Sequence, residues 1–271
     1  MAALIPIDDP QDPRIAAYAQ VRERDLVGRD GLFVAEGQVV VRMLAQSPLC
    51  RPVSLLLAEK RVAALADILD RLPAAAEVFV APQAVMDQIV GFPIHRGILG
   101  LGRRSAVPSA AELLGGLGDG ALVLALCGIS NHDNMGGLFR NAAAFGADAV
   151  ILDADCCDPL YRKAIRVSVG AALTTPFAQL KAGDDLVGLL RAEGFEALSL
   201  SPSGATSLSA VRRPRRTAVL MGAEGPGLSA EVLASTRTVT IPMATGFDSL
   251  NVATTAGIVL HHLGFVAERE T

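Results

Sequence analysis

The sequence predicts an α/β protein in which a mainly parallel sheet is preceded by a smaller α/β domain. Short apolar runs, typical of strands, alternate with longer segments of helical spacing along the chain. In the C-terminal half the strand candidates are apolar throughout, which is typical of a parallel sheet with helices on both faces. The chain has 271 residues, 51% of them hydrophobic, enough for one large or two modest domains with proper cores.

The N-terminal half alternates helical and extended patterns. Its expected helices lie at 13–28, 37–46, 60–72 and 82–90, and its expected strands at 53–58, 78–81 and 98–102. A stretch rich in alanine, glycine and serine follows, and it predicts a short helix and a linker. We therefore expect a small domain over 1–105, a linker over 106–118 and a second domain over 119–271.

The C-terminal half is more regular. Strands are expected at 122–127, 149–152, 197–200, 218–221 and 239–242. The helical patterns between and after them lie at 137–145, 159–168, 185–193, 230–236 and 249–266. The longest uncharged stretch, 249–267, carries serine, asparagine, threonine and histidine, so it predicts a buried helix and not a membrane span.

Composition and motifs exclude several classes of protein. A net charge of −4 with this apolar content excludes a disordered chain, and 19% charged residues are too few for a coiled coil. No GxxxxGK[ST] loop and no GxGxxG between a strand and a helix occurs, so the familiar nucleotide-binding motifs are absent. No Cys/His cluster occurs either, and we expect no metal. The four cysteines form no CxxC pair, and the acidic N-terminus is unlike a signal peptide. We expect a cytoplasmic protein with no membrane partner.

Three segments place polar residues where an expected strand ends. They are 131–146 (NHDNMGGLFRNAAAFG), 221–228 (MGAEGPGL) and 241–255 (IPMATGFDSLNVATT). The first holds Asn134 in an expected tight turn and Arg140 on the helix after it, and the second surrounds Glu224 with glycines that expose backbone N–H groups. The third brings Ser249 and Asn251 to the start of a long helix. Ligands of open α/β sheets bind at the carboxyl ends of the strands, so the three together favour a binding site.

Each of these polar groups also has an ordinary structural explanation. Arg140 would fit a salt bridge on a helix surface, and Glu224 would fit an exposed turn. Ser249 would fit the N-cap of the helix that follows it. The functional interpretation therefore depends on all three segments meeting at one edge of the sheet.

In this order and spacing the segments resemble the motifs of the SpoU-type (TrmH-like) RNA ribose 2′-O-methyltransferases, in the SPOUT class. The similarity rests on NxGxxxR at 134–140, GAEGxGL at 222–228, IPM at 241–243 and SLN at 249–251. It covers roughly residues 118–267. FVAEG at 33–37 and HRG at 95–97 are similar to the small substrate-binding domain of that family.

The resemblance implies a fold, a cofactor and an assembly. The second domain would be a SPOUT domain with a C-terminal trefoil knot, a feature otherwise nearly absent from proteins. The cofactor would be S-adenosylmethionine, and the protein would be a homodimer with its active site close to the interface. By match to the family motifs, the residues contacting the cofactor would be Gly222, Gly227, Ile241, Met243 and Leu250.

The resemblance also assigns roles to the polar residues. Arg140 matches the catalytic arginine of the family. Because a guanidinium is normally charged, we expect it to bind an RNA phosphate and to stabilise a developing alkoxide, and not to act as a base. Asn134 and Glu224 would orient Arg140 and the ribose, while Ser249 and Asn251 would complete the pocket.

An acidic protein that binds RNA must concentrate its basic residues locally. Four arginines and no acidic residue occur within 211–216, and further arginines lie near the expected domain junction. We expect phosphate contacts from Arg212, Arg213, Arg215, Arg216, Arg96 and Arg104. An ordinary solvated face stays the alternative for each cluster.

The leading hypothesis is an enzyme that uses S-adenosylmethionine to methylate a ribose 2′-hydroxyl of structured RNA. The two-domain layout favours rRNA over tRNA, by analogy only. The alternative is a non-catalytic RNA-binding or ribosome-assembly protein that retains the knotted fold. A different α/β enzyme with a nucleotide cofactor would need a phosphate-binding motif, and none is found.

Overall fold

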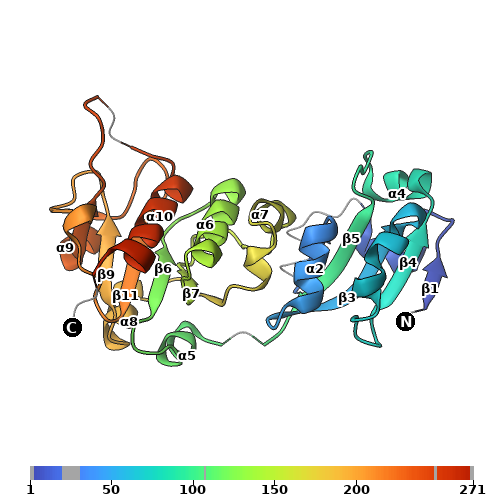
Figure 1. The fold of residues 1–271 in the computed structure, drawn as a ribbon, viewed down its shortest axis with the longest axis horizontal. Helices are drawn as coiled ribbons and strands as arrows, with labels where there is room; N and C mark the ends of the chain where they lie inside the picture. The colour runs from blue at the N-terminus through green and yellow to red at the C-terminus, as the bar shows by residue number, and fades with distance from the viewer. Residues whose placement is uncertain (1–2, 20–30, 107, 247–248, 269–271) are drawn as a thin grey trace. The chain divides into compact units, whose positions relative to one another are not determined.

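The computed structural model describes residues 3–19, 31–106, 108–246 and 249–268, which form two compact units (Figure 1). Unit 1 comprises Met1–Ala106 together with Leu160–Thr174, and unit 2 comprises Val107–Pro159 and Thr175–Thr271. The expected linker at 106–118 contains helix α5 (Ala110–Gly115), whose buried side chains belong to the core of unit 2.

Unit 1 is built on a mixed five-stranded sheet with the strand order β1-β4-β3-β5-β2. Its strands are β1 (Leu4–Pro6), β2 (Leu32–Glu36), β3 (Cys50–Ala58), β4 (Glu77–Ala81) and β5 (Ile98–Arg104). Strand β5 is antiparallel to both β2 and β3, whereas β1, β4 and β3 run parallel. The central strand β3 buries three consecutive leucines, Leu55, Leu56 and Leu57, because side chains on both faces of this sheet are covered.

The helices of unit 1 are short. They are α2 (Gln38–Gln46), α3 (Ala66–Leu69) and α4 (Gln83–Val90), with 3-10 turns η1 (Pro13–Tyr18), η2 (Glu59–Arg61) and η3 (Ala63–Leu65). The expected helix at 60–72 is therefore wrong as one element, since the chain breaks it into two 3-10 turns and one turn of α-helix. Part of the expected helix at 13–28 lies outside the described residues.

A segment from the middle of the chain completes unit 1. Helix α7 (Arg162–Val167) and the 3-10 turn η4 (Ala171–Leu173) follow a strand of unit 2, yet they group with unit 1. Helix α7 packs on β2, and the hydroxyl of Ser47 after α2 donates to the carbonyl of Leu173. The expected division into continuous segments does not anticipate this return of the chain.

Unit 2 contains a seven-stranded sheet in which every neighbouring pair is parallel, with the order β10-β12-β9-β11-β6-β7-β8. The strands are β6 (Leu122–Leu126), β7 (Ala149–Leu152), β8 (Phe177–Gln179), β9 (Glu196–Leu200), β10 (Thr206–Ser207), β11 (Thr217–Met221) and β12 (Arg237–Thr240). All residues of β6 and β11 are buried, which requires cover on both faces. The expected parallel sheet is confirmed.

Helices α5, α8 (Leu186–Ala192) and α9 (Ala230–Ser235) pack on one apolar core of this sheet. Helices α6 (His132–Ala144) and α10 (Val252–His261) pack against each other, and a π-helical turn, His262–Val266, follows α10 (Figure 1). A Cβ atom on Gly137 of α6 would lie 2.7 Å from the Ala253 Cβ, so the glycine lets α6 and α10 approach closely.

Two starts of helices differ from the sequence-based expectation. Helix α6 begins at His132, because the Asn131 side chain accepts hydrogen bonds from the Asp133 and Asn134 N–H groups as an N-cap. Gly137 therefore lies inside the helix and not in a tight turn. Helix α10 begins at Val252, three residues later than expected.

No helix in the described part of the chain is long and apolar enough to cross a membrane.

Candidate active site

One cavity of unit 2 has a volume of about 500 Å³ and lies beyond the carboxyl ends of β9, β11 and β12. Its walls come from three loops, and the lining residues fall within 200–202, 221–227 and 241–255. The last two are segments that the sequence singled out, and they meet here as expected for ligands of parallel sheets. The first, Leu200–Pro202, was missed, although it too carries polar and proline residues directly after a strand.

Close backbone packing shapes the loop after β11. A Cβ atom on Gly222 would collide with the backbone of Gly227 and Leu228, so no other residue fits at this position without opening the loop. The Gly227 N–H donates to the Ala223 carbonyl at 3.0 Å and closes the loop. Glu224 at its tip is exposed and lines the cavity. The loop therefore offers the cavity a wall of backbone and one carboxylate.

Asn251 joins the three predicted motifs. Its Nδ2 donates to the Asn134 Oδ1 at 2.8 Å and to the Glu224 Oε1 at 2.9 Å. Its Oδ1 accepts from the backbone N–H groups of Ala253 and Thr254 at 2.9 and 3.2 Å, as the N-cap of α10. Because two N–H groups hold the oxygen, the amide nitrogen must point toward the other two side chains. Asn134, Asn251 and Glu224 thus form one array, called here the polar array.

Ser249 lines the same cavity, but it does not cap the helix. Asn251 takes that position, so the ordinary explanation for Ser249 as an N-cap is wrong. The five residues expected to contact a cofactor, Gly222, Gly227, Ile241, Met243 and Leu250, all line this cavity.

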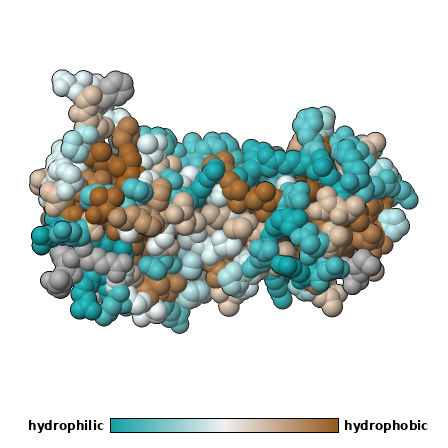
Figure 2. Space-filling view, in the orientation of Figure 1, coloured by the Kyte–Doolittle hydropathy of each residue, from teal (hydrophilic) through white to brown (hydrophobic). Residues whose placement is uncertain are grey.

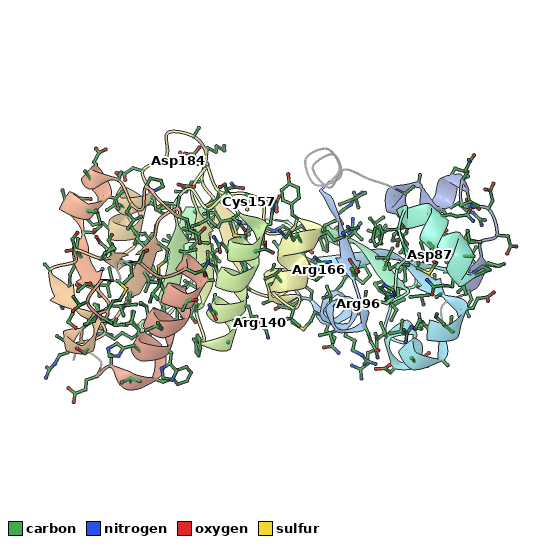
Figure 3. The ribbon with its side chains drawn as sticks, turned by 90° about the horizontal axis from the view of Figure 1, so that it is seen from above. Asp87, Arg96, Arg140, Cys157, Arg166 and Asp184 are labelled. Atoms are coloured by element: carbon green, nitrogen blue, oxygen red, sulfur yellow. The ribbon has the colours of Figure 1, made fainter. Side chains whose placement is uncertain are left out.

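Arg140 lies apart from the polar array. It is exposed on α6, and within the described residues it has no hydrogen bond or ion pair (Figure 3). Arg140 follows the buried Asn134 by six positions in α6, which places the two side chains about 120° apart around the helix axis. The structure shows no hydrogen bond from Asn134 or Glu224 to Arg140, and the expected orientation of Arg140 by these two residues stays a prediction.

Two of the arginines expected to bind RNA are structural. Arg213 is 5% exposed and donates to the carbonyl oxygens of Gly120 and Leu263. Arg216 donates to the carbonyls of Leu114 and Leu117 at 2.7 and 3.2 Å, and its guanidinium lies 4.4 Å from the Phe195 ring centroid. Arg216 thus adds a donor to the Leu114 carbonyl, which also accepts from the Leu117 N–H, and supplies one to the Leu117 carbonyl just after α5. The expectation of phosphate contacts from Arg213 and Arg216 is wrong.

The other four arginines of that expectation are less buried than Arg213. Arg212 and Arg215 are exposed and lie 3.4 Å from Glu268 and 2.7 Å from Asp119, respectively. Arg96 lines a separate cavity in unit 1, and Arg104 is half-buried at the end of β5. RNA contact by these four stays a prediction.

Burial makes the thiols of this chain poor nucleophiles at neutral pH. It raises the pKa of Cys50 and of Cys157 to about 11 and that of Cys127 to about 12, and it raises the pKa of Cys156 further. No disulfide links them. In the part of the chain that the structure describes, no three His, Cys, Asp or Glu side chains form a group that could hold a metal ion.

The similarity to known proteins covers both the cavity and the whole chain. A family model described as the SpoU rRNA Methylase family matches residues 121–261. An uncharacterized tRNA/rRNA methyltransferase of Mycobacterium bovis is 39% identical over 274 residues, which cover 94% of this chain and 92% of that protein. A protein of Synechocystis with the same description is 37% identical over 141 residues, which cover 52% of each chain.

Solved structures of low identity share the fold. The AdoMet-bound rRNA methyltransferase from Sinorhizobium meliloti has a TM-score of 0.80 at 21% identity, with 96% of this chain and 97% of that one covered. The SpoU methyltransferase AviRb from Streptomyces viridochromogenes, in complex with AdoMet, has a TM-score of 0.79 at 21% identity, with 93% and 97% covered.

Proposed function

The chain belongs to the SpoU rRNA Methylase family, and from this premise we propose that it is an RNA 2′-O-ribose methyltransferase that uses S-adenosylmethionine. The proposed substrate is structured RNA, with rRNA favoured over tRNA because a second α/β unit accompanies the unit with the cavity. The observation that carries the proposal is the polar array beside a cavity at the ends of parallel strands.

The cavity suits S-adenosylmethionine in its size and its walls. A volume of about 500 Å³ is typical of sites for small molecules. Backbone groups at Gly222 and Gly227 have no side chains to shield them, and Ile241, Met243 and Leu250 offer apolar surface. These five residues are the proposed cofactor contacts. When bound, the cofactor supplies a methyl group carried on a positively charged sulfur.

The polar array would orient the ribose. Asn251 is held at both ends of its amide, so it fixes Asn134 and Glu224 relative to the cavity. The Oε1 atom of Glu224 accepts from Asn251, while the structure gives the Oε2 atom no hydrogen bond within the described residues. Oε2 can therefore accept from a ribose hydroxyl, with Ser249 as a second polar contact at the wall. Such fixed groups lower the entropic cost of aligning the reactants.

Arg140 is the proposed catalytic arginine, and it acts through its charge. A guanidinium stays protonated at any pH at which proteins function, so it does not take the hydroxyl proton. It can bind a phosphate beside the target ribose and stabilise negative charge that develops on the 2′-oxygen. Because Arg140 and the polar array lie apart in one chain, bound RNA or a second chain must complete the site.

An exposed apolar surface next to α6 supports a homodimer. Ile258 on α10 and Phe265 and Val266 after it are exposed, and Figure 2 shows hydrophobic surface over α10. The Phe145 ring at the end of α6 lies 6.5 Å from that of Phe265. Grouped apolar side chains of this size favour an interface. Since α10 packs on α6, a second copy on this face would adjoin the helix that carries Arg140.

Close contact between two segments supports the proposed C-terminal trefoil knot. A Cβ atom on Gly204, after β9, would collide with the backbone of Val239 and Thr240 in β12. The Thr240 hydroxyl also donates to the Pro202 carbonyl at 3.0 Å. The loop after β9 thus presses on β12 just before the chain enters the cavity wall, as a threaded segment would require.

Methyl transfer from isotope-labelled S-adenosylmethionine to purified rRNA and, in parallel, to tRNA tests the proposal. We expect label in rRNA, and digestion to nucleosides with mass spectrometry should find it as 2′-O-methylribose. Label on a base would contradict ribose specificity, and label in tRNA alone would contradict the preference for rRNA. Binding of both cofactor and RNA without transfer would favour the non-catalytic RNA-binding alternative.

Arg140→Ala tests the proposed catalytic residue. We expect turnover to fall at least ~100-fold, because charge stabilisation in the transition state is lost. Calorimetric titration should find cofactor affinity within about twofold of the parent protein, since Arg140 does not line the cavity. Arg140→Lys retains the charge without the planar fork and should fall in between. Near-normal turnover of Arg140→Ala would remove Arg140 from the active site.

Asn251→Asp separates the capping role of Asn251 from its orienting role. The aspartate keeps an oxygen for the N-cap, so the free energy of unfolding should change by less than about 1 kcal/mol. It loses the donor and places a second carboxylate next to Glu224, so turnover should fall at least ~10-fold. Urea unfolding and initial rates measure the two effects. Retained turnover would contradict the orienting role.

A further inference from the structure

Unit 1 contains a second cavity, of about 380 Å³, that none of the motif residues of unit 2 line. Its walls include the first turn of helix α2 and three arginines, Arg61, Arg96 and Arg166. Figure 3 labels Arg96 and Arg166. The arginines come from η2, from the loop before β5 and from α7. They are far apart in the sequence, so composition and local charge runs do not reveal the cluster. We call this site the α2 cavity.

Positive charge exceeds negative charge in the α2 cavity. Glu36 is the one carboxylate among its lining residues, against three guanidiniums. Glu36 is also shared, because its Oε2 lies 3.9 Å from Arg162 Nε and 4.0 Å from Arg166 Nη1, both beyond direct hydrogen-bond distance. The Glu36 carboxylate therefore forms long ion pairs with Arg162 and Arg166. Arg61 and Arg96 have no carboxylate partner among the residues that the structure describes.

The guanidinium groups have unused donors. Arg61 contacts the His95 carbonyl at 3.4 Å, and its Nε is shielded from solvent with no partner in the described structure. The Arg96 side chain packs against Gly37, where a Cβ atom would lie 2.9 Å from Nη1. Gly37, with φ of +93°, thereby places Arg96 next to the start of α2.

The first turn of α2 adds backbone donors to the same cavity. The N-cap is Gly37, which offers no capping side chain. In the described structure the N–H groups of Gln38, Val39 and Val40 have no partner, since the first intrahelical bond runs from Val41 N–H to the Gly37 carbonyl. Free N–H groups and the positive end of the helix dipole favour an anion at this point. Guanidinium forks match the oxygens of a phosphate.

We propose that the α2 cavity binds a phosphate of the RNA backbone, through residues other than those of the methyl-transfer site. The inference rests on the proposed function for the nature of the ligand, since free phosphate or a nucleotide shares the same chemistry. A volume of about 380 Å³ admits a nucleotide-sized group and not only an ion. The exposed side chain of Val39 lines the cavity without charge, so it adds no repulsion.

Three variants test the site by fluorescence anisotropy with a labelled rRNA fragment that the parent protein methylates. Arg61→Gln and Arg96→Gln should each weaken RNA binding about fivefold to tenfold and lower the slope of log affinity against log salt by about one. Gln38→Glu places a negative charge in the first turn of α2, where it favours the helix dipole and repels a phosphate. Its unfolding midpoint should hold or rise while its RNA affinity falls, which a merely structural role would not produce.

Matched controls separate this inference from the proposed function. Arg71→Gln removes an exposed arginine of unit 1 that does not line the cavity, and it should leave RNA affinity within twofold. In the site variants KM for RNA should rise while kcat holds, because none of the substituted residues belongs to the proposed methyl-transfer site. Parent-like RNA affinity in all three variants would overturn the inference while methylation by the parent stands. Failure of the parent to bind RNA would overturn the proposed function itself.

Inorganic phosphate and a mononucleotide, titrated by calorimetry, distinguish the source of the phosphate. Weak binding of both, lost in Arg61→Gln, together with reduced RNA affinity, supports an RNA phosphate. Tight binding of the mononucleotide with unchanged RNA affinity in the variants would overturn the assignment to RNA.

Discussion

Two groups of arginines in this molecule differ in what their guanidiniums contact. The segment Val211–Arg216 holds four arginines within six residues, yet Arg213 and Arg216 donate to backbone carbonyls of unit 2. The arginines of the α2 cavity come from three distant points of the chain, and two of them, Arg61 and Arg96, have no carboxylate partner among the described residues. Density of positive charge along a sequence is therefore a poor guide to a phosphate site.

The difference has a physical origin in where each group sits. The carbonyls of Leu117 and Gly120 lie just after helix α5, where no helical N–H follows to satisfy them, and they accept from arginine side chains. An arginine placed nearby satisfies them with its rigid fork and loses its availability to a ligand. The start of α2 has the opposite need, because it exposes N–H groups and requires acceptors. Arginines near these N–H groups add positive charge and therefore favour binding of an anion further.

Arg213→Ala should produce the largest effect on folding. Truncation leaves the carbonyls of Gly120 and Leu263 without their charged donor in a buried place, so the free energy of unfolding should fall by about 3 kcal/mol. Urea unfolding of the whole chain measures the change. RNA affinity of the remaining folded protein should match that of the parent. A fully stable variant with weak RNA binding would return Arg213 to the RNA interface.

The stability of the folded chain should depend on alkaline pH, whereas RNA binding through arginines should not. Burial raises the pKa of Cys50 to about 11, and it also raises the pKa of Tyr18, whose hydroxyl bonds with the Ser54 hydroxyl at 2.8 Å. A raised pKa means that the folded state holds its proton longer than the unfolded state does. This stability is complete below the unfolded pKa of about 9 for the thiol and is lost as pH rises through the folded value.

We therefore expect the free energy of unfolding, measured with urea, to be flat near neutral pH and to fall above about pH 9, by up to about 1.4 kcal/mol per pH unit for each titrating group. RNA binding should stay flat over the range in which the protein remains folded, because guanidiniums keep their charge. A loss of RNA affinity between pH 7 and 9 would assign the contact to groups other than arginine.

The sequence predicts well those elements that adjacent residues determine, and poorly those that depend on contacts between distant segments. The expected strands at 122–127, 149–152 and 218–221 match β6, β7 and β11 within one residue, because continuous apolar runs report burial directly. The predicted start of α6 is wrong because the sequence pattern interprets Gly137 as part of a turn. Gly137 instead allows α6 to pack closely on α10, a contact with a distant segment that a local pattern does not show. The grouping of α7 with unit 1 also depends on contacts that no local pattern records.

The candidate site shows the same limit. Asn134, Glu224 and Asn251 were singled out one by one, and the structure joins them through one amide. Their partnership could be expected only from the rule that parallel strands end at the same edge. Arg140 points away from this array because of its angular position on α6. That position can be worked out from the sequence only when the first residue of the helix is known. For the α2 cavity the sequence indicated only Arg96 and the segments 33–37 and 95–97, and the addition of Arg61 and Arg166 depends on long-range contacts.

The exposed members of the Val211–Arg216 segment should show the smallest effects. Arg212 and Arg215 have side chains that are 71% and 69% exposed, and each lies near one carboxylate, of Glu268 and Asp119. Exposed pairs of this kind contribute about 0–1 kcal/mol, so the double variant Arg212→Gln/Arg215→Gln should unfold within about 1 kcal/mol of the parent. The neighbouring carboxylates weaken the local positive field, and RNA affinity should therefore fall only about twofold to threefold. Anisotropy titrations at two salt concentrations, beside Arg61→Gln, compare the two groups directly. A larger loss from the double variant than from Arg61→Gln would place the main RNA contact on unit 2 and reverse the ranking of the two groups.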